Sequence, residues 1–147
     1  MFQNILAAVD QSPRAEGVIQ AAGELAERFK GRVHLYTALA VPPEFPAAAA
    51  NHPDTLLPYL TEQARTRLEA LAANWPGVQI EPPAVLHGQP WRDILATAER
   101  LGCDLIVIGS HGYGGWDRVL GTIAGKIANH ATLPVLIIHE RPKLPDA

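Results

Sequence analysis

Short apolar runs alternate with amphipathic segments along the whole chain. The first run, residues 5–9, is apolar on both faces, which is typical of a strand buried in a parallel sheet. The segments between the runs place an apolar residue every three or four positions, which is the spacing of an amphipathic helix. We predict five strands, at residues 5–9, 33–39, 78–86, 105–108 and 135–138, and four helices, with apolar positions spanning residues 18–29, 56–71, 94–101 and 123–127.

Serine, glycine and proline residues mark the boundaries of these elements. Ser12 and Pro13 predict the start of the first helix, with the serine as its capping residue, and Gly31 predicts its end. The prolines at 82–83 lack the N–H group that a sheet ladder needs. The third strand is therefore expected at an edge of the sheet.

This order of elements predicts an α/β fold with a five-stranded parallel sheet in the order 3-2-1-4-5 and helices on both faces. The chain contains no repeat or linker that would divide it, so we expect a single Rossmann-like domain over residues 1–147. In such sheets, ligands bind beyond the carboxyl ends of the strands, where the strand order reverses. Asp10 ends the first strand and Gly109 ends the fourth, so we expect both residues at the binding edge.

A glycine-rich loop follows the fourth predicted strand and precedes the fourth predicted helix. It begins at Gly109 and includes Gly112, and the pair Gly121-Thr122 opens the helix. Glycines let backbone N–H groups approach a phosphate, and a helix N-terminus supplies unpaired donors and the positive end of a dipole. The loop therefore predicts a nucleotide site. Segment 121–127 is not a P-loop, because it has three residues between its glycines rather than four.

Charge, the length of the apolar runs and the cysteine count limit the classes of partner and the cellular compartment that we expect. The chain carries a net charge of −3, whereas a general nucleic-acid binder needs a basic face, so we expect no nucleic-acid partner. No apolar run approaches the ~18 residues of a membrane span, and no signal-peptide pattern is apparent at the N-terminus, so we expect no membrane partner. The single cysteine, Cys103, cannot form an internal disulfide, which favours a reducing compartment. We expect a cytoplasmic protein.

The chain resembles the universal stress protein family from residue 1 to about residue 139. The matching segments are Ile-Leu-Ala-Ala-Val-Asp-Gln-Ser at 5–12, His-Gly-Gln-Pro at 87–90, Asp-Leu-Ile-Val-Ile-Gly-Ser-His-Gly at 104–112, Gly-Thr at 121–122 and Ala-Thr-Leu-Pro-Val-Leu-Ile-Ile at 131–138. Nucleotide-binding members carry a phosphate loop of the pattern G-x2-G-x9-G-[S/T]. Here eight residues, 113–120, separate the second and third glycines, so the loop is one residue shorter. It is similar to the shorter loops of the F and G type bacterial members, which also bind ATP.

The resemblance implies roles for individual residues. Backbone N–H groups of the loop and the Thr122 hydroxyl would surround the phosphates. Asp10 would accept hydrogen bonds from the ribose hydroxyls, and the backbone of Ala38 would face the adenine. The phosphate set is Gly109, Gly112, Gly121, Thr122 and Ile123, with Ser110, His111 and Arg118 as secondary phosphate contacts.

These residues also have simpler interpretations, which stay open at this point. The glycines fit an ordinary surface loop, Asp10 fits a cap of the first helix, and His111 fits a loop histidine without a ligand. The other histidines show no metal-ligand spacing, and Cys103 fits a small buried apolar residue.

The resemblance implies an ATP-binding stress-response protein that acts as a nucleotide-dependent switch or sensor, with slow or no hydrolysis. The expected ligand is ATP, with AMP or ADP as alternatives and Mg²⁺ or Mn²⁺ as an optional companion ion, and the protein partner is unknown. Two other functions stay open. One is a dimeric interaction module without nucleotide binding, and the other is a weak ATPase or phosphotransferase that would depend on Asp10 and Asp117.

The final predicted strand indicates a homodimer. Segment 135–138 is apolar on both faces, yet as the fifth strand in the order 3-2-1-4-5 it lies at an edge. An exposed apolar edge strand favours aggregation unless something covers it. We expect this C-terminal strand to pair with its own copy across a two-fold axis, and the family resemblance points the same way.

Overall fold

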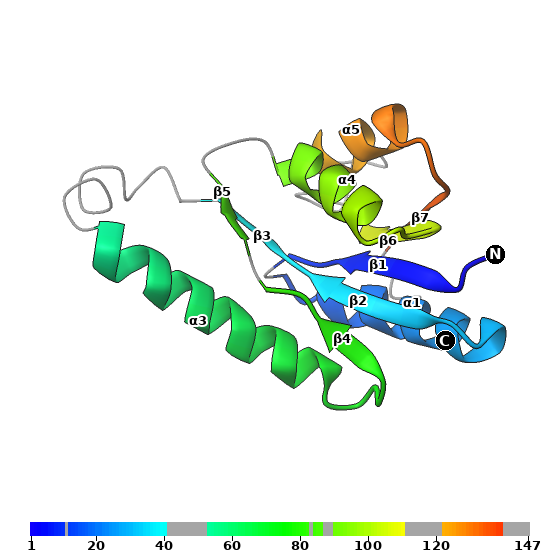
Figure 1. Ribbon diagram of the computed structural model, residues 1–147, viewed down its shortest axis with the longest axis horizontal. Helices are drawn as coiled ribbons and strands as arrows, with labels where there is room; N and C mark the ends of the chain where they lie inside the picture. The colour runs from blue at the N-terminus through cyan, green and yellow to red at the C-terminus, as the bar shows by residue number, and fades with distance from the viewer. Residues whose placement is uncertain (11, 41–52, 83, 87–89, 111–121, 140–147) are drawn as a thin grey trace, which may run out of the picture.

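The computed structural model describes residues 1–10, 12–40, 53–82, 84–86, 90–110 and 122–139. In this part of the chain, five strands form an all-parallel sheet with the predicted order 3-2-1-4-5 (Figure 1). From one edge to the other, the strands are β4 (Val78–Ile80), β2 (Arg32–Tyr36), β1 (Asn4–Ala8), β6 (Leu105–Gly109) and β7 (Val135–Ile138). The predicted fold class is therefore confirmed.

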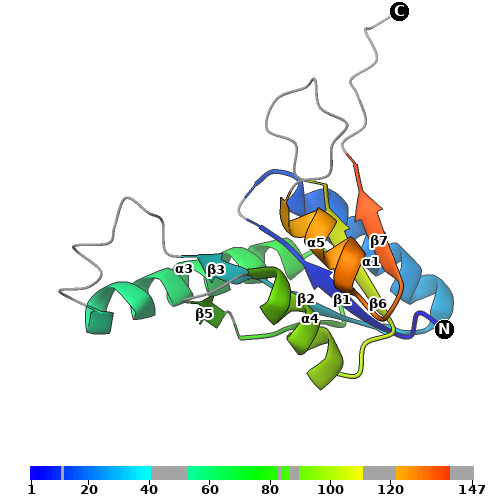
Figure 2. The same ribbon diagram turned by 90° about the horizontal axis from the view of Figure 1, so that it is seen from above.

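Helices cover both faces of this sheet (Figures 1 and 2). One face packs against α1 (Ala15–Phe29) and α3 (Pro53–Ala72), and the other packs against α4 (Pro90–Arg100) and α5 (Thr122–His130). The four predicted helices are all present in the described residues. None of these helices combines the length and the apolarity that crossing a membrane requires.

The central strand β1 contributes to both cores. Ile5 and Ala7 belong to the cluster on the α1 side, whereas Leu6 and Ala8 belong to the cluster on the α4 side. Ile5, Leu6 and Ala7 have no exposed surface at all. A strand that is covered on both faces can carry no polar side chain without a buried partner, which is why residues 5–8 of β1 are all apolar.

Two of the predicted strands are each divided in two. The predicted strand 33–39 is β2 followed by β3 (Ala38–Ala40), and the predicted strand 78–86 is β4 followed by β5 (Ala84–Leu86). β3 and β5 pair with each other in a separate two-stranded parallel sheet. The predicted edge position of the third strand is confirmed for β4, which pairs only with β2 within the described residues.

Local hydrogen bonding explains both interruptions. The buried Thr37, between β2 and β3, directs its hydroxyl to the carbonyl oxygen of Val9 at 2.7 Å, at the end of β1. Glu81 still donates its backbone N–H to Leu35 at 2.9 Å, but the next residue, Pro82, has no N–H to donate. The main sheet therefore ends on this side before β5 begins.

The first helix begins later than its sequence predicts. α1 starts at Ala15, the preceding residue is Arg14, and no side chain makes a cap hydrogen bond there, so Ser12 is not the cap residue of this helix. The Ser12 hydroxyl instead accepts the backbone N–H of Arg14 at 3.3 Å, just before the helix. Ser12 lies in the turn before the helix, where its carbonyl oxygen accepts the N–H of Ala15 at 3.2 Å. At the other end the prediction holds, because the helix ends at Phe29.

Gly31 is required by a close approach of two backbone segments. The left-handed residue at this helix end is Lys30, with a φ of 53°, and Gly31 is not among the positive-φ residues. A Cβ atom on Gly31 would lie 2.7 Å from the Cα atom of Gln3. Arg32 donates its N–H to the carbonyl oxygen of Gln3 at 2.9 Å, so the two segments cannot separate without losing a hydrogen bond.

We predict that Gly31→Ala lowers the free energy of unfolding by about 1–3 kcal/mol, the usual cost of overpacking. The matched control is Gly125→Ala in α5, where a new Cβ atom meets nothing within 4 Å. Replacing that helical glycine should stabilise the protein by about 0.5–1 kcal/mol. Urea unfolding followed by circular dichroism measures both values. A Gly31→Ala protein as stable as wild type would contradict the close approach.

Candidate functional site

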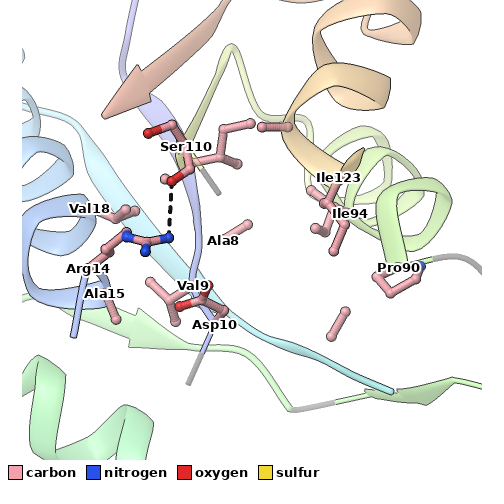
Figure 3. Close-up of a pocket in the computed structure, with 14 residues that line it drawn as sticks. Ala8, Val9, Asp10, Arg14, Ala15, Val18, Pro90, Ile94, Ser110 and Ile123 are labelled. Atoms are coloured by element: carbon pink, nitrogen blue, oxygen red, sulfur yellow. Dashed lines mark hydrogen bonds between the residues drawn. The ribbon is translucent and has the colours of Figure 1, made fainter. Parts of the chain in front are cut away.

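A cleft opens at the carboxyl ends of β1 and β6, where the strand order reverses (Figure 3). The empty space in and around this cleft, open solvent included, is about 540 Å³. The starts of α1, α4 and α5 and the first residue of β3 complete its walls. This is the edge at which open parallel sheets bind their ligands. Its apolar lining comprises Ala8, Val9, Ala15, Val18, Ala38, Pro90, Ile94, Ile108, Ile123 and Ala124.

Half of the predicted site residues line this cleft. They are Asp10, Ala38, Gly109, Ser110 and Ile123, which come from four segments of the chain. Thr122 is the first residue of α5, which begins beside the cleft. The other four predicted residues, His111, Gly112, Arg118 and Gly121, lie outside the described residues. The structure thus brings together the two strand ends, and the ligand contacts of these residues stay predictions.

Asp10 closes a tight turn at the end of β1. Its Oδ1 atom accepts the backbone N–H of Ser12 at 2.9 Å and the Ser12 hydroxyl at 2.6 Å. This is the pattern of an Asx turn, in which a carboxylate fixes the backbone two residues further along. The carboxylate does not cap α1, which begins five residues later at Ala15. Asp10 is therefore oriented by the turn while it lines the cleft.

Arg67 of α3 holds the same turn from the opposite side. Its Nη2 atom donates to the carbonyl oxygen of Ser12 at 2.9 Å. Its Nε atom is buried and has no hydrogen-bond partner among the described residues. A small cavity beside it is also lined by Asp10 and Thr37. The sequence carries no signal for this contact, because Arg67 lies in the middle of a helix and 55 residues from Ser12.

Arg14 is a second arginine that the sequence analysis missed. It precedes α1, and its Nη1 atom donates to the carbonyl oxygen of Ser110 at 3.3 Å, beyond the end of β6. Figure 3 shows the guanidinium group extending from the α1 side toward Ser110. Its position just after the predicted end of the first strand is the one signal that the sequence offered.

The α4 wall of the cleft rests on a polar contact with the sheet. The hydroxyl of the buried Tyr36 donates to the carboxylate of Asp93, which precedes the cleft residue Ile94. Burial raises the pKa of Asp93 above its ordinary value, and the nearby Arg100 partly offsets this effect. A half-buried carboxylate thus helps to position the apolar wall.

Two further titratable side chains, His34 and Cys103, lie in structural surroundings away from the cleft. His34 lies between Glu81 and Asn4, with its Nδ1 and Nε2 atoms each 2.8 Å from an oxygen of these residues. Cys103 packs against the α4-side core, and burial, with smaller effects of Asp104 and Glu81, raises the pKa of its thiol to about 11. Within the described residues, no three side chains of the metal-ligating types gather at one place.

Fold and cleft together define a parallel α/β protein with a cleft at its topological switch point. The universal stress protein family matches residues 1–139, and the chain belongs to this family. Universal stress protein A homolog 1 of Coxiella burnetii is 32% identical over 139 residues, which cover 93% of this chain and 96% of that protein.

Two solved structures share the fold. The protein MJ0577 has a TM-score of 0.77 at 23% identity, and the match covers 97% of this chain and 99% of that one. The universal stress protein from Archaeoglobus fulgidus, solved in complex with dAMP, has a TM-score of 0.61 at 22% identity, with 92% of this chain and 96% of that chain covered. Both matches extend over more than nine tenths of this chain.

We predict that Asp93→Asn stabilises the protein at neutral pH. Because the folded-state pKa of Asp93 is raised, wild-type protein gains stability as the pH falls through that pKa and loses it as the pH rises. An asparagine keeps an acceptor for Tyr36 and has no charge to desolvate. The advantage of the variant should therefore be present above the raised pKa and disappear in acid. Urea unfolding at a series of pH values measures it.

Asp104→Asn is the control of opposite sign. Burial alone would raise the pKa of Asp104, but the N–H groups of Gln3 and Asn4 donate to its carboxylate at 3.0 Å, and its pKa lies below the ordinary value. The stabilisation that the ionised Asp104 carboxylate provides is lost as the pH falls through its lowered pKa. This variant should be less stable than wild type at neutral pH and should lose its disadvantage in acid. If both variants changed the free energy of unfolding in the same direction at pH 7, the opposite pKa shifts of Asp93 and Asp104 would be refuted.

Proposed function

We propose that the cleft at the ends of β1 and β6 binds an adenine nucleotide, with ATP as the principal ligand and AMP or ADP as alternatives. The observation that carries this proposal is the convergence of Asp10, Ala38, Gly109, Ser110 and Ile123 on one cleft. The family resemblance implies a ligand contact for each of these five residues. The relative solved with dAMP, which has the same fold, supports the class of ligand.

The walls of the cleft suit the parts of a nucleotide. We assign the adenine to the apolar side formed by Ala38 and Ile94, and the ribose to the Asp10 carboxylate. We assign the phosphates to the backbone after Gly109 and to the start of α5, where unpaired N–H groups favour anions. The remaining predicted phosphate contacts, His111, Gly112, Arg118, Gly121 and Thr122, belong to the same proposal.

The proposed role is that of a cytoplasmic stress-response protein in which nucleotide occupancy acts as a switch or a sensor for an unidentified protein partner. We propose slow or no hydrolysis, because the one acidic side chain that lines the described cleft, Asp10, is engaged in its own turn. A companion Mg²⁺ or Mn²⁺ ion would be held mainly by the phosphates of the nucleotide.

We further propose a homodimer through β7. This strand pairs only with β6 in the described sheet, and its Leu136 side chain is 37% exposed. The strand is apolar, and an apolar edge strand needs a partner to cover it. Antiparallel pairing of β7 with its own copy would give its backbone groups hydrogen-bond partners and would cover its apolar side chains.

The test of nucleotide binding is Gly109→Val. A Cβ atom at Gly109 makes ordinary contacts, 3.5 Å from Val18 and 3.9 Å from Arg14, so the fold should persist while the added methyl groups occupy space at the β6 end of the cleft. Loss of one hydrogen bond to a charged group costs about 1.5–3 kcal/mol, so ATP affinity should fall at least about tenfold. Calorimetric titration, with and without Mg²⁺, measures it.

The control for this titration is Gly125→Val, which introduces the same side chain on α5 where a Cβ atom meets nothing within 4 Å. It should bind ATP as wild type does. Wild-type affinity in a folded Gly109→Val protein would overturn the site. A wild-type protein that binds no ATP but dimerises would point to the interaction module instead, and steady phosphate release in a long assay would point to an ATPase.

The dimer is tested by Leu136→Lys, which places a charge on the exposed side of β7. Light scattering should give about twice 15.8 kDa for wild type and the monomer mass for the variant. Tyr59→Lys is the matched control, because Tyr59 is also exposed but lies on α3. It should remain dimeric. A wild-type monomer in this measurement would exclude the proposed interface.

A further inference from the structure

The guanidinium group of Arg14 is fixed at one end of the cleft. Arg14 is half-buried, and its hydrogen bond to the Ser110 carbonyl oxygen, at 3.3 Å, carries its charge from α1 across to the end of β6 (Figure 3). Ser110 is the residue with which the glycine-rich loop leaves the sheet. The positive charge therefore lies beside the backbone to which the phosphates are assigned.

The charges that line the cleft are few. Among its described lining residues, Arg14 is the single basic side chain and Asp10 the single acidic one. Asp10 is oriented by its turn with Ser12, and a phosphate brings negative charge that a carboxylate repels. Of these side chains, only Arg14 can compensate an anionic ligand. A guanidinium carries its charge on a planar fork of N–H donors, which is the geometry that binds two phosphate oxygens at once.

The α4 wall of the cleft is apolar, and Arg14 lies on the opposite side (Figure 3). Pro90 and Ile94 form the α4 side, whereas Arg14 and Ser110 lie on the side of α1 and β6 (Figure 3). We infer that Arg14 binds a phosphate of the ligand and that this contact selects nucleotides over nucleosides. This inference rests on the proposed function, and it adds a residue that the glycine-loop pattern does not contain.

A purely structural role for Arg14 makes a different prediction. If Arg14 only fastens α1 to the end of β6, its loss loosens the cleft for every ligand, charged or not. If it binds a phosphate, its loss affects only ligands that carry one. Adenosine, AMP and ATP share the same base and ribose and differ in phosphate number, so they separate the two roles.

The experiment titrates the purified full chain with adenosine, AMP and ATP by calorimetry. Arg14→Gln keeps a donor for the Ser110 carbonyl oxygen and removes the charge. It should weaken AMP and ATP binding by about tenfold or more, the loss expected for a hydrogen bond to a charged group, and leave adenosine binding unchanged. Arg14→Lys, which keeps a charge without the fork, should fall between this variant and wild type.

Arg28→Gln is the matched control, because it removes the same charge from the last turn of α1, far from the end of the helix that Arg14 precedes. It should bind all three ligands as wild type does. Equal losses for adenosine and AMP in Arg14→Gln, or no loss for any ligand, would overturn the inference while leaving nucleotide binding intact. If wild-type protein binds none of the three ligands, the proposed function fails and the inference fails with it.

Discussion

β1 lies between β2 and β6, and its parallel pairing with both strands is the constraint on which the rest of the structure depends. Ala8 is aligned with Tyr36 on one side and with Ile108 on the other, so the three strands end at the same edge. The chain that leaves β1 must turn over this edge to reach α1. That turn carries Asp10 to the cleft, and the residues that follow β6 arrive there for the same reason.

Much of the fold follows from the sequence, because the spacing of apolar residues predicts which positions are buried. A strand such as β1, covered on both faces, can be recognised from its residues alone, and the order of strands and helices leaves few ways to connect a parallel sheet. The divisions of the second and third predicted strands could not be derived in the same way. One depends on the Thr37 hydroxyl reaching Val9, a partner 28 residues away, although Pro82 gave a local signal for the other.

The candidate site was predictable where a residue acts through its position at the end of a strand. Asp10 and Gly109 are such residues, and the sheet order alone brings them together. Arg14 and Arg67 act through long side chains whose partners, Ser110 and Ser12, are set by tertiary packing. A sequence pattern records spacing along one element, and it does not record which carbonyl oxygen of another element a guanidinium group will reach. The start of α1 was missed for a related reason, because Asp10 engages Ser12 in a turn.

The turn between β1 and α1 is tied to three other parts of the molecule, through Thr37, Arg67 and Arg14. Fixing the backbone of a residue costs about 1–2 kcal/mol in conformational entropy. In this turn, the cost is met when the protein folds and not when a ligand binds. A ligand that contacts this turn meets backbone whose conformation these hydrogen bonds already hold in place. Substitution of Arg67 in α3, on the far side of the turn, would therefore weaken the binding of a ligand at this edge by loosening the turn, without removing a ligand contact.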